Sequence, residues 1–308
     1  MARKPNTKHQ TPNTKNYLDP VFLSRLANLE LVARCMVEGF FSGEHPSPFH
    51  GFSVEYSDHR EYVVGDELKF VDWKVYGRTD KLYIKQFQQE TNTTVYLLLD
   101  SSQSMAFRDA GAVSKLEYAS YLAAALTHMM LKQADSVSLL CFADKILNRV
   151  PGSSRRTQLH AVLAGLQANR AQGQTRLADV LHQVADLTKR RGLIILLSDL
   201  LDDQQEILDG LAHLKYLEHD VLVFQILDHQ ELTLDYEGAV QFEDMESSDI
   251  MRVNAPSLRA AYQHRVQTFL NEIQKTLGNS AIEYCLCDTS LPMDRAIIAY
   301  LAKRRRLK

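Results

Sequence analysis

The sequence predicts an α/β fold with a mainly parallel sheet, because short apolar runs alternate with helical patterns from residue 94 onward. Val95–Leu99, Leu193–Leu197 and Val221–Leu227 are continuous apolar runs of strand length. Such runs are typical of strands that are buried on both faces. Since helical patterns separate them, right-handed crossovers would cover both faces of the sheet with helices.

The other elements follow from periodicity and from turn residues. Apolar side chains at helical spacing predict helices at 17–38, 115–132, 204–217, 257–277 and 292–304, and another that Thr175 opens. Further strands are expected at 137–142 and 282–286, with an edge strand at 146–150. Gly278 is well placed to end the long helix that precedes it.

Composition indicates a soluble, globular protein. Of the 308 residues, 45% are hydrophobic and 24% are charged. The net charge of −3 argues against a general nucleic-acid binder, which needs a basic face. No apolar run reaches the roughly 18 residues of a membrane helix, and the polar N-terminus does not resemble a secretory signal. We therefore expect a cytoplasmic protein without a transmembrane segment, whose four cysteines are structural thiols.

Changes in pattern divide the chain into three parts. Residues 1–16 are rich in Lys, Asn, Thr and Pro, which predicts a disordered tail. Residues 17–90 combine the N-terminal helix with short aromatic and β-branched runs, which indicate a small β-rich subdomain. Residues 91–308 hold the alternating strands and helices.

Polar side chains gather where the first buried strand ends. Asp100, Ser102 and Ser104 follow the apolar run directly, and ligands bind beyond the carboxyl ends of parallel strands. Their oxygens are hard ligands that suit Mg²⁺ or Mn²⁺. The alternative is that these residues only cap the following helix.

Two later residues complete a recognisable set. Thr175 lies at the expected start of a helix, and Asp199 ends another buried strand. The pattern Asp-x-Ser-x-Ser, then Thr, then a strand-end Asp resembles the metal-ion-dependent adhesion site of von Willebrand factor A-like domains. This resemblance implies a Rossmann-like von Willebrand A fold. It also implies a metal site formed by Asp100, Ser102, Ser104, Thr175 and Asp199.

The region before the sheet carries a second resemblance. It contains Arg60-x-Tyr62-x-x-Gly65-Asp66, then Asp72-Trp73, Arg78 and Lys85. This pattern resembles the signature of the domain-of-unknown-function family fifty-eight, as do the later segments Leu227–Glu231 and Asp288–Pro292. His229 stands where that family usually has proline. Members are commonly encoded beside MoxR-type AAA+ ATPases, so the resemblance implies such an ATPase, or its client, as the partner.

The charged and aromatic residues of this signature have two interpretations. Interleaved opposite charges are typical of an ion-pair network that stabilises a small subdomain, with Trp73 as its anchor. Trp, Tyr and Arg are also enriched at protein-binding hot spots. Under that second interpretation, the candidate partner-binding residues are Arg60, Tyr62, Asp66, Asp72, Trp73, Arg78 and Lys85.

Together these features predict a non-enzymatic, Mg²⁺-dependent adaptor that helps a MoxR-type ATPase to assemble, mature or activate a client protein. The competing class is a haloacid-dehalogenase-type phosphohydrolase, which also uses a strand-end aspartate and Mg²⁺. That chemistry needs an acid where this chain has Ser102, and no lysine in the sequence can be assigned its phosphate-binding role. A P-loop is absent from the sequence as well. A third possibility is a structural scaffold with an empty metal site.

Overall fold

The computed structural model describes residues 18–26, 28–42, 59–63, 71–85, 93–109, 113–243, 245 and 250–306. The chain divides into two compact units. The smaller is Pro46–Asn92, and the larger joins Met1–His45 to Thr93–Lys308.

The smaller unit contains two short strands, separated in sequence by a short helix. β1 (His59–Glu61) pairs antiparallel with β2 (Tyr83–Lys85), and α3 (Trp73–Thr79) falls between them in sequence. Asp72 is the N-cap of α3, since its carboxylate accepts the N–H groups of Lys74 and Val75. The helix ends where Asp80 adopts a left-handed conformation, with φ of 52°.

The larger unit is built on a six-stranded sheet. Its strands are β3 (Thr94–Asp100), β4 (Ser136–Phe142), β5 (Ile146–Ser153), β6 (Leu193–Ser198), β7 (Asp220–Leu227) and β10 (Glu283–Asp288). They lie in the order β10-β7-β6-β3-β4-β5, and all neighbours are parallel except β4 and the edge strand β5. The predicted α/β fold with a mainly parallel sheet is therefore confirmed.

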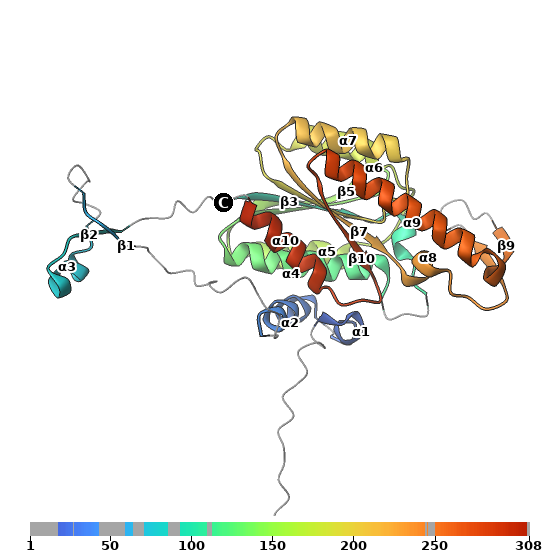
Figure 1. Ribbon diagram of the computed structural model, residues 1–308, viewed down its shortest axis with the longest axis horizontal. Helices are drawn as coiled ribbons and strands as arrows, with labels where there is room; N and C mark the ends of the chain where they lie inside the picture. The colour runs from blue at the N-terminus through green and yellow to red at the C-terminus, as the bar shows by residue number, and fades with distance from the viewer. Residues whose placement is uncertain are drawn as a thin grey trace, which may run out of the picture. The chain divides into compact units, whose positions relative to one another are not determined.

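Helices cover both faces of this sheet (Figure 1). One face contacts α4 (Lys115–Lys132), α5 (Gln158–Ala168) and α10 (Asp294–Arg306), and α2 (Leu29–Ser42) packs against α4. The other face packs against α6 (Leu177–Leu187), α7 (Gln204–Tyr216) and α9 (Ala255–Asn279). The remaining elements are α1 (Pro20–Leu23), the 3-10 helix η3 (Gln103–Ala106), α8 (His229–Thr233) and the hairpin of β8 (Ala239–Glu243) with β9 (Ile250–Asn254).

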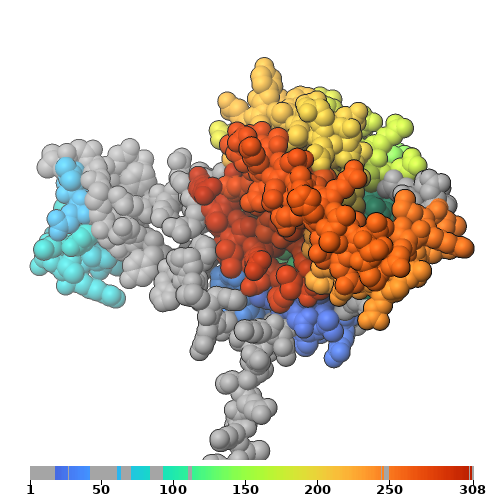
Figure 2. All heavy atoms as spheres, turned by 45° about the vertical axis from the view of Figure 1, so that its right-hand side comes forward, coloured from blue at the N-terminus to red at the C-terminus, as the bar shows by residue number. Residues whose placement is uncertain are grey.

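The core forms because the central strands are apolar along their whole length. Every residue of β6 is buried, as is every residue of β7 after the first. Leu98, Ile194 and Val223 of three neighbouring strands meet Leu181 of α6 and Leu211 of α7 in one cluster. Each such side chain stabilises the fold by about 1.5–3 kcal/mol. In contrast, α9 buries only four residues, and much of it lies on the molecular surface (Figure 2, orange).

Several elements differ from the sequence prediction. The expected helix at 17–38 is two helices, α1 and α2. The helix expected from Thr175 begins only at Leu177, and α5 has no counterpart in the prediction. Gly278 lies inside α9 and does not end it. The left-handed residue comes later, at Ala281, with φ of 52°.

The basic C-terminal helix is anchored in the fold by ion pairs. Arg304 donates to the carboxylate of Asp135 at 2.6 Å, and both side chains are buried. Lys303 lies 3.3 Å from Asp220 and 3.7 Å from Glu283. The positive charges of Lys303 and Arg304 are therefore paired with carboxylates of the protein itself. Among the helices of the described residues, none is long and apolar enough to cross a bilayer.

We predict that Gly192→Ala destabilises the protein by about 1–3 kcal/mol or more. A Cβ at this position, just before β6, would overlap the carbonyl oxygen of Thr94 in the neighbouring strand. Gly278→Ala is the control, because nothing lies within 4 Å of a Cβ there. Urea unfolding measures both variants, and equal stability of the two would contradict the prediction.

We also predict that Arg304→Ala destabilises the protein by about 3–5 kcal/mol, because it leaves a buried carboxylate without its guanidinium partner. Arg306→Ala is the matched control, since the Arg306 side chain is 74% exposed and Arg304 only 8%. The exposed pair should contribute less than about 1 kcal/mol. Thermal unfolding compares the two, and a similar loss in both would refute a structural role specific to Arg304.

Candidate functional site

Aspartates mark the carboxyl ends of four neighbouring parallel strands. Asp100 and Asp288 are the last residues of β3 and β10, and Asp199 and Asp228 directly follow β6 and β7. Because parallel strands end at the same edge of a sheet, these residues come together although they are far apart in sequence. This edge is the candidate site.

Asp100 is fully buried and is held by neutral donors. Its Oδ1 accepts the N–H of Ser102 at 2.9 Å, and its Oδ2 accepts the hydroxyl of Ser198 at 2.6 Å. Burial raises the pKa of the Asp100 carboxyl to about 7, and the negative charge of Asp199 adds to this shift. Asp100 therefore favours a cation beside it.

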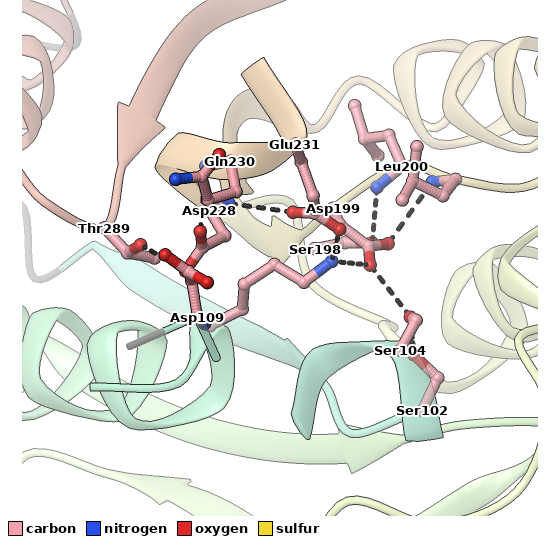
Figure 3. Close-up of polar contacts among 12 residues, drawn as sticks. Ser102, Ser104, Asp109, Ser198, Asp199, Leu200, Asp228, Gln230, Glu231 and Thr289 are labelled. Carbon is pink, nitrogen blue, oxygen red and sulfur yellow. Dashed lines mark hydrogen bonds and ion pairs between the residues drawn. The ribbon is translucent and has the colours of Figure 1, made fainter. Parts of the chain in front are cut away.

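Ser102 and Ser104, which follow β3, connect the end of that strand to Asp199 (Figure 3). Their hydroxyl oxygens lie 3.1 Å apart, and the Ser104 hydroxyl donates to Asp199 Oδ2 at 2.8 Å. Ser102 is the N-cap of η3, yet its side chain makes no capping hydrogen bond. The capping alternative therefore does not account for either hydroxyl.

Thr175 lies in the loop before α6, where its side chain is half-buried. Two backbone hydrogen bonds attach this loop to the serine segment. Gln103 N–H donates to the carbonyl of Gly173 at 2.9 Å, and Gln172 N–H donates to the carbonyl of Ser101 at 2.8 Å. Asn169 adds a third connection, because its amide donates to the Ser101 hydroxyl at 2.7 Å. The structure thus brings the loop of Thr175 to the segment that carries the two serines.

Asp199 is fixed by its backbone as well as by its side chain. Its carbonyl accepts the amide of Gln225 from β7 at 2.8 Å, and its Oδ1 accepts the N–H of Leu201 at 3.2 Å. Leu200, which lies between Asp199 and Leu201 in sequence, has φ of 56°. A left-handed conformation at a non-glycine residue costs on the order of 1–2 kcal/mol and is frequent at functional sites. The surroundings therefore hold Asp199 in one position.

A buried lysine also contacts Asp199, and the sequence analysis did not identify it. Lys115, the first residue of α4, places its ammonium 2.8 Å from Asp199 Oδ2 and 2.7 Å from Glu231 Oε1. The Lys115 and Asp199 side chains are 0% exposed, and that of Glu231 is 21% exposed. Although burial lowers the pKa of Lys115, the charges of Asp199 and Glu231 outweigh it and keep the pKa raised. The ammonium is therefore charged.

Glu231 reaches the lysine because α8 has a capping box. Its other oxygen accepts the N–H of Asp228 at 2.8 Å, and Asp228 in turn caps the helix through the N–H of Gln230. Asp228 Oδ2 also accepts the hydroxyl of Thr289 at 3.2 Å. Figure 3 shows Asp228 between Thr289 and Glu231, and Glu231 near Asp199. The ends of β7 and β10 are thus connected to the same network.

Of the five predicted metal ligands, four lie in one hydrogen-bonded network: Asp100, Ser102, Ser104 and Asp199. Within the described residues, no three His, Cys, Asp or Glu side chains are placed to hold a metal ion by themselves. These four side chains supply two carboxylates and two hydroxyls, all hard oxygen donors of the kind that Mg²⁺ or Mn²⁺ prefers, and Thr175 would add a third hydroxyl. An ion here would depend on the hydroxyl oxygens.

The predicted partner-binding residues lie in the smaller unit, apart from this network in sequence. Asp66 and the side chains of Arg60 and Lys85 are outside the described residues. Trp73 is 60% exposed and makes an edge-on contact with Tyr76.

Asp100→Asn gives a prediction about metal-free protein. The pKa of Asp100 is raised above the unfolded value of about 3.9. In EDTA, the contribution of Asp100 to wild-type stability should therefore fall by on the order of a few kcal/mol as pH rises from about 4 to about 7. Asp100→Asn should lack most of this fall. Thermal unfolding at a series of pH values measures this difference, and Asp209→Asn, which changes an exposed aspartate, is the control. Parallel curves of stability against pH for wild type and both variants would contradict the prediction.

Comparison with known proteins finds relatives that cover most or part of the chain. A protein of Mycobacterium tuberculosis (strain H37Rv) named "Uncharacterized protein Rv1480" is 24% identical over 294 residues, which cover 94% of this chain and 91% of that protein. "Uncharacterized protein YeaD" of Bacillus subtilis (strain 168) is 31% identical over 98 residues, which cover 32% of this chain and 22% of that protein.

Among solved structures, one match is the conserved hypothetical protein BatB of Bacteroides thetaiotaomicron, with a TM-score of 0.49 and 13% identity over 70% of this chain and 100% of that one. The family model described as "Protein of unknown function DUF58" matches residues 58–269. Since this match spans more than half of the 308 residues, the chain belongs to the DUF58 family.

Proposed function

We propose that this chain is a non-enzymatic adaptor that binds a partner protein through a Mg²⁺ or Mn²⁺ ion held at the carboxyl edge of the sheet. The observation that carries the proposal is the hydrogen bond from Ser104 to Asp199, two residues 95 positions apart in sequence. It brings a hydroxyl oxygen from the segment after β3 to a carboxylate that follows β6, near the fully buried Asp100.

We further propose that the larger unit is a von Willebrand factor A-like domain and that its edge is a metal-ion-dependent adhesion site. What supports this is the strand order, with one antiparallel edge strand, together with the donor set. Asp100, Ser102, Ser104, Thr175 and Asp199 would hold the ion directly or through water. When bound, the ion would supply a positive centre to which a carboxylate of the partner could bind.

The protein's own residues prepare this edge for an ion. The Ser198 hydroxyl and the Ser102 N–H orient the Asp100 carboxylate. The Leu201 N–H bonds the Asp199 carboxylate, and the side-chain amide of Gln225 bonds the Asp199 carbonyl, so both hold Asp199. Because the donors are oriented before an ion arrives, little ordering entropy is lost on binding. Family membership, rather than geometry, suggests the partner, a MoxR-type AAA+ ATPase or its client.

The phosphohydrolase alternative gains a lysine at the site but still lacks its other requirements. Lys115 is buried and already bonded to two carboxylates, so its ammonium is not presented to a phosphate group. Ser102, two residues after Asp100, cannot act as the general acid that this chemistry needs. We therefore favour binding over catalysis.

The test is an affinity capture with purified, tagged protein in Mg²⁺ or in EDTA. We expect wild type to retain the AAA+ ATPase or its client in Mg²⁺ and to lose it in EDTA, because chelation removes the bridging ion. The Asp100→Ala variant should fail to retain it even in Mg²⁺, because it lacks a ligand of that ion. Asp209→Ala, an exposed aspartate on α7, is the matched control and should behave as wild type. Mass spectrometry identifies the captured proteins. Identical partners in every lane would show that recognition does not depend on the ion.

A further inference from the structure

Lys115 contacts a proposed metal ligand through a buried charge. The Lys115 side chain is 0% exposed, and its ammonium lies 2.8 Å from Asp199 Oδ2 and 2.7 Å from Glu231 Oε1. The ring of Phe107 lies over it, with 5.9 Å between the nitrogen and the ring centroid. This cation belongs to the chain itself, and its position is set by the start of α4.

One oxygen of Asp199 has two donors. Asp199 Oδ2 accepts both the Lys115 ammonium and the Ser104 hydroxyl, each at 2.8 Å. Its Oδ1 accepts the Leu201 N–H at 3.2 Å. A divalent ion that uses Asp199 must share a carboxylate already bonded to a cation, and like charges in a buried site repel strongly. Lys115 therefore opposes the ion for which the oxygens are suited.

We propose that Lys115 is a tethered counter-cation that competes with the divalent ion for Asp199 and sets the site's affinity for the ion low. This inference rests on the proposed function, because it requires that an ion binds. Glu231 keeps the ammonium between two carboxylates, so Lys115 need not leave the protein interior when an ion arrives. A low affinity makes ion binding depend on the partner's carboxylate, which adds the missing negative charge.

The ion pair of Lys115 with Asp199 also stabilises the metal-free protein. A buried carboxylate without a cation is strongly destabilising, and Lys115 supplies that cation to Asp199 in the absence of metal. Removing the lysine should therefore have two linked effects. The metal-free protein should lose stability, and the divalent ion should restore it.

The test uses the full chain with Lys115→Met, Lys115→Gln and, as control, Lys132→Met, which changes an exposed lysine at the other end of α4. Gln keeps a hydrogen-bond donor for Asp199 without the charge. Calorimetric titration with MnCl₂ should show binding at least about tenfold tighter in both Lys115 variants than in wild type. Their melting temperatures should also rise more on adding Mg²⁺ to EDTA-treated protein.

The outcomes separate this inference from the proposed function. If wild type binds Mn²⁺ and the Lys115 variants bind it equally or more weakly, competition is refuted while the metal site stands. If Lys115→Met fails to fold, the Mn²⁺ affinity of Lys115→Gln relative to wild type decides whether Lys115 competes with the ion. If wild type and every variant bind no ion in the titration, both the metal site and the competition are overturned. A gain in Lys132→Met equal to that of the Lys115 variants would also refute a role specific to Lys115.

Discussion

The buried carboxylate of Asp199 is the group on which the carboxyl edge of the sheet depends. It accepts hydrogen bonds from Ser104 after β3, from Lys115 at the start of α4 and from Leu201 in its own loop. Through Glu231, the network continues to the end of β7. Removing water from such a charge costs several kcal/mol, and these partners offset that cost. Four segments must therefore be in place together.

The periodic elements could be predicted from the sequence, because apolar spacing decides them. The α4 helix at 115–132 and the strands beginning near Val95 and Leu193 agree with the structure to within a residue or two. The irregular parts could not be predicted. The helix α5 has weak amphipathic patterning, and the break at residues 24–28 between α1 and α2 carries neither glycine nor proline.

The site was predictable where strand ends determine it and unpredictable where side-chain burial does. Asp100 and Asp199 follow apolar runs, so their common edge could be inferred from the parallel topology. Lys115 gave no such signal. Ser114 and Glu117 form a capping box around it, and a lysine in the first turn of a helix is usually exposed. Glu231 lies in a segment that the family resemblance marked, but only packing reveals its contact with Lys115.

The two aspartates of the site have opposite electrostatic surroundings, which suggests a division of roles between them. Asp199 has an ammonium beside it, whereas Asp100 accepts the hydroxyl of Ser198 and the N–H of Ser102. Burial raises the pKa of Asp100 to about 7, so near neutral pH this carboxyl changes charge readily. The proposed divalent ion would therefore gain more from Asp100 than from Asp199, whose charge Lys115 already offsets. Under this proposal Asp100 is the residue whose charge responds to the ion, while Asp199 and Lys115 keep a fixed ion pair beside it.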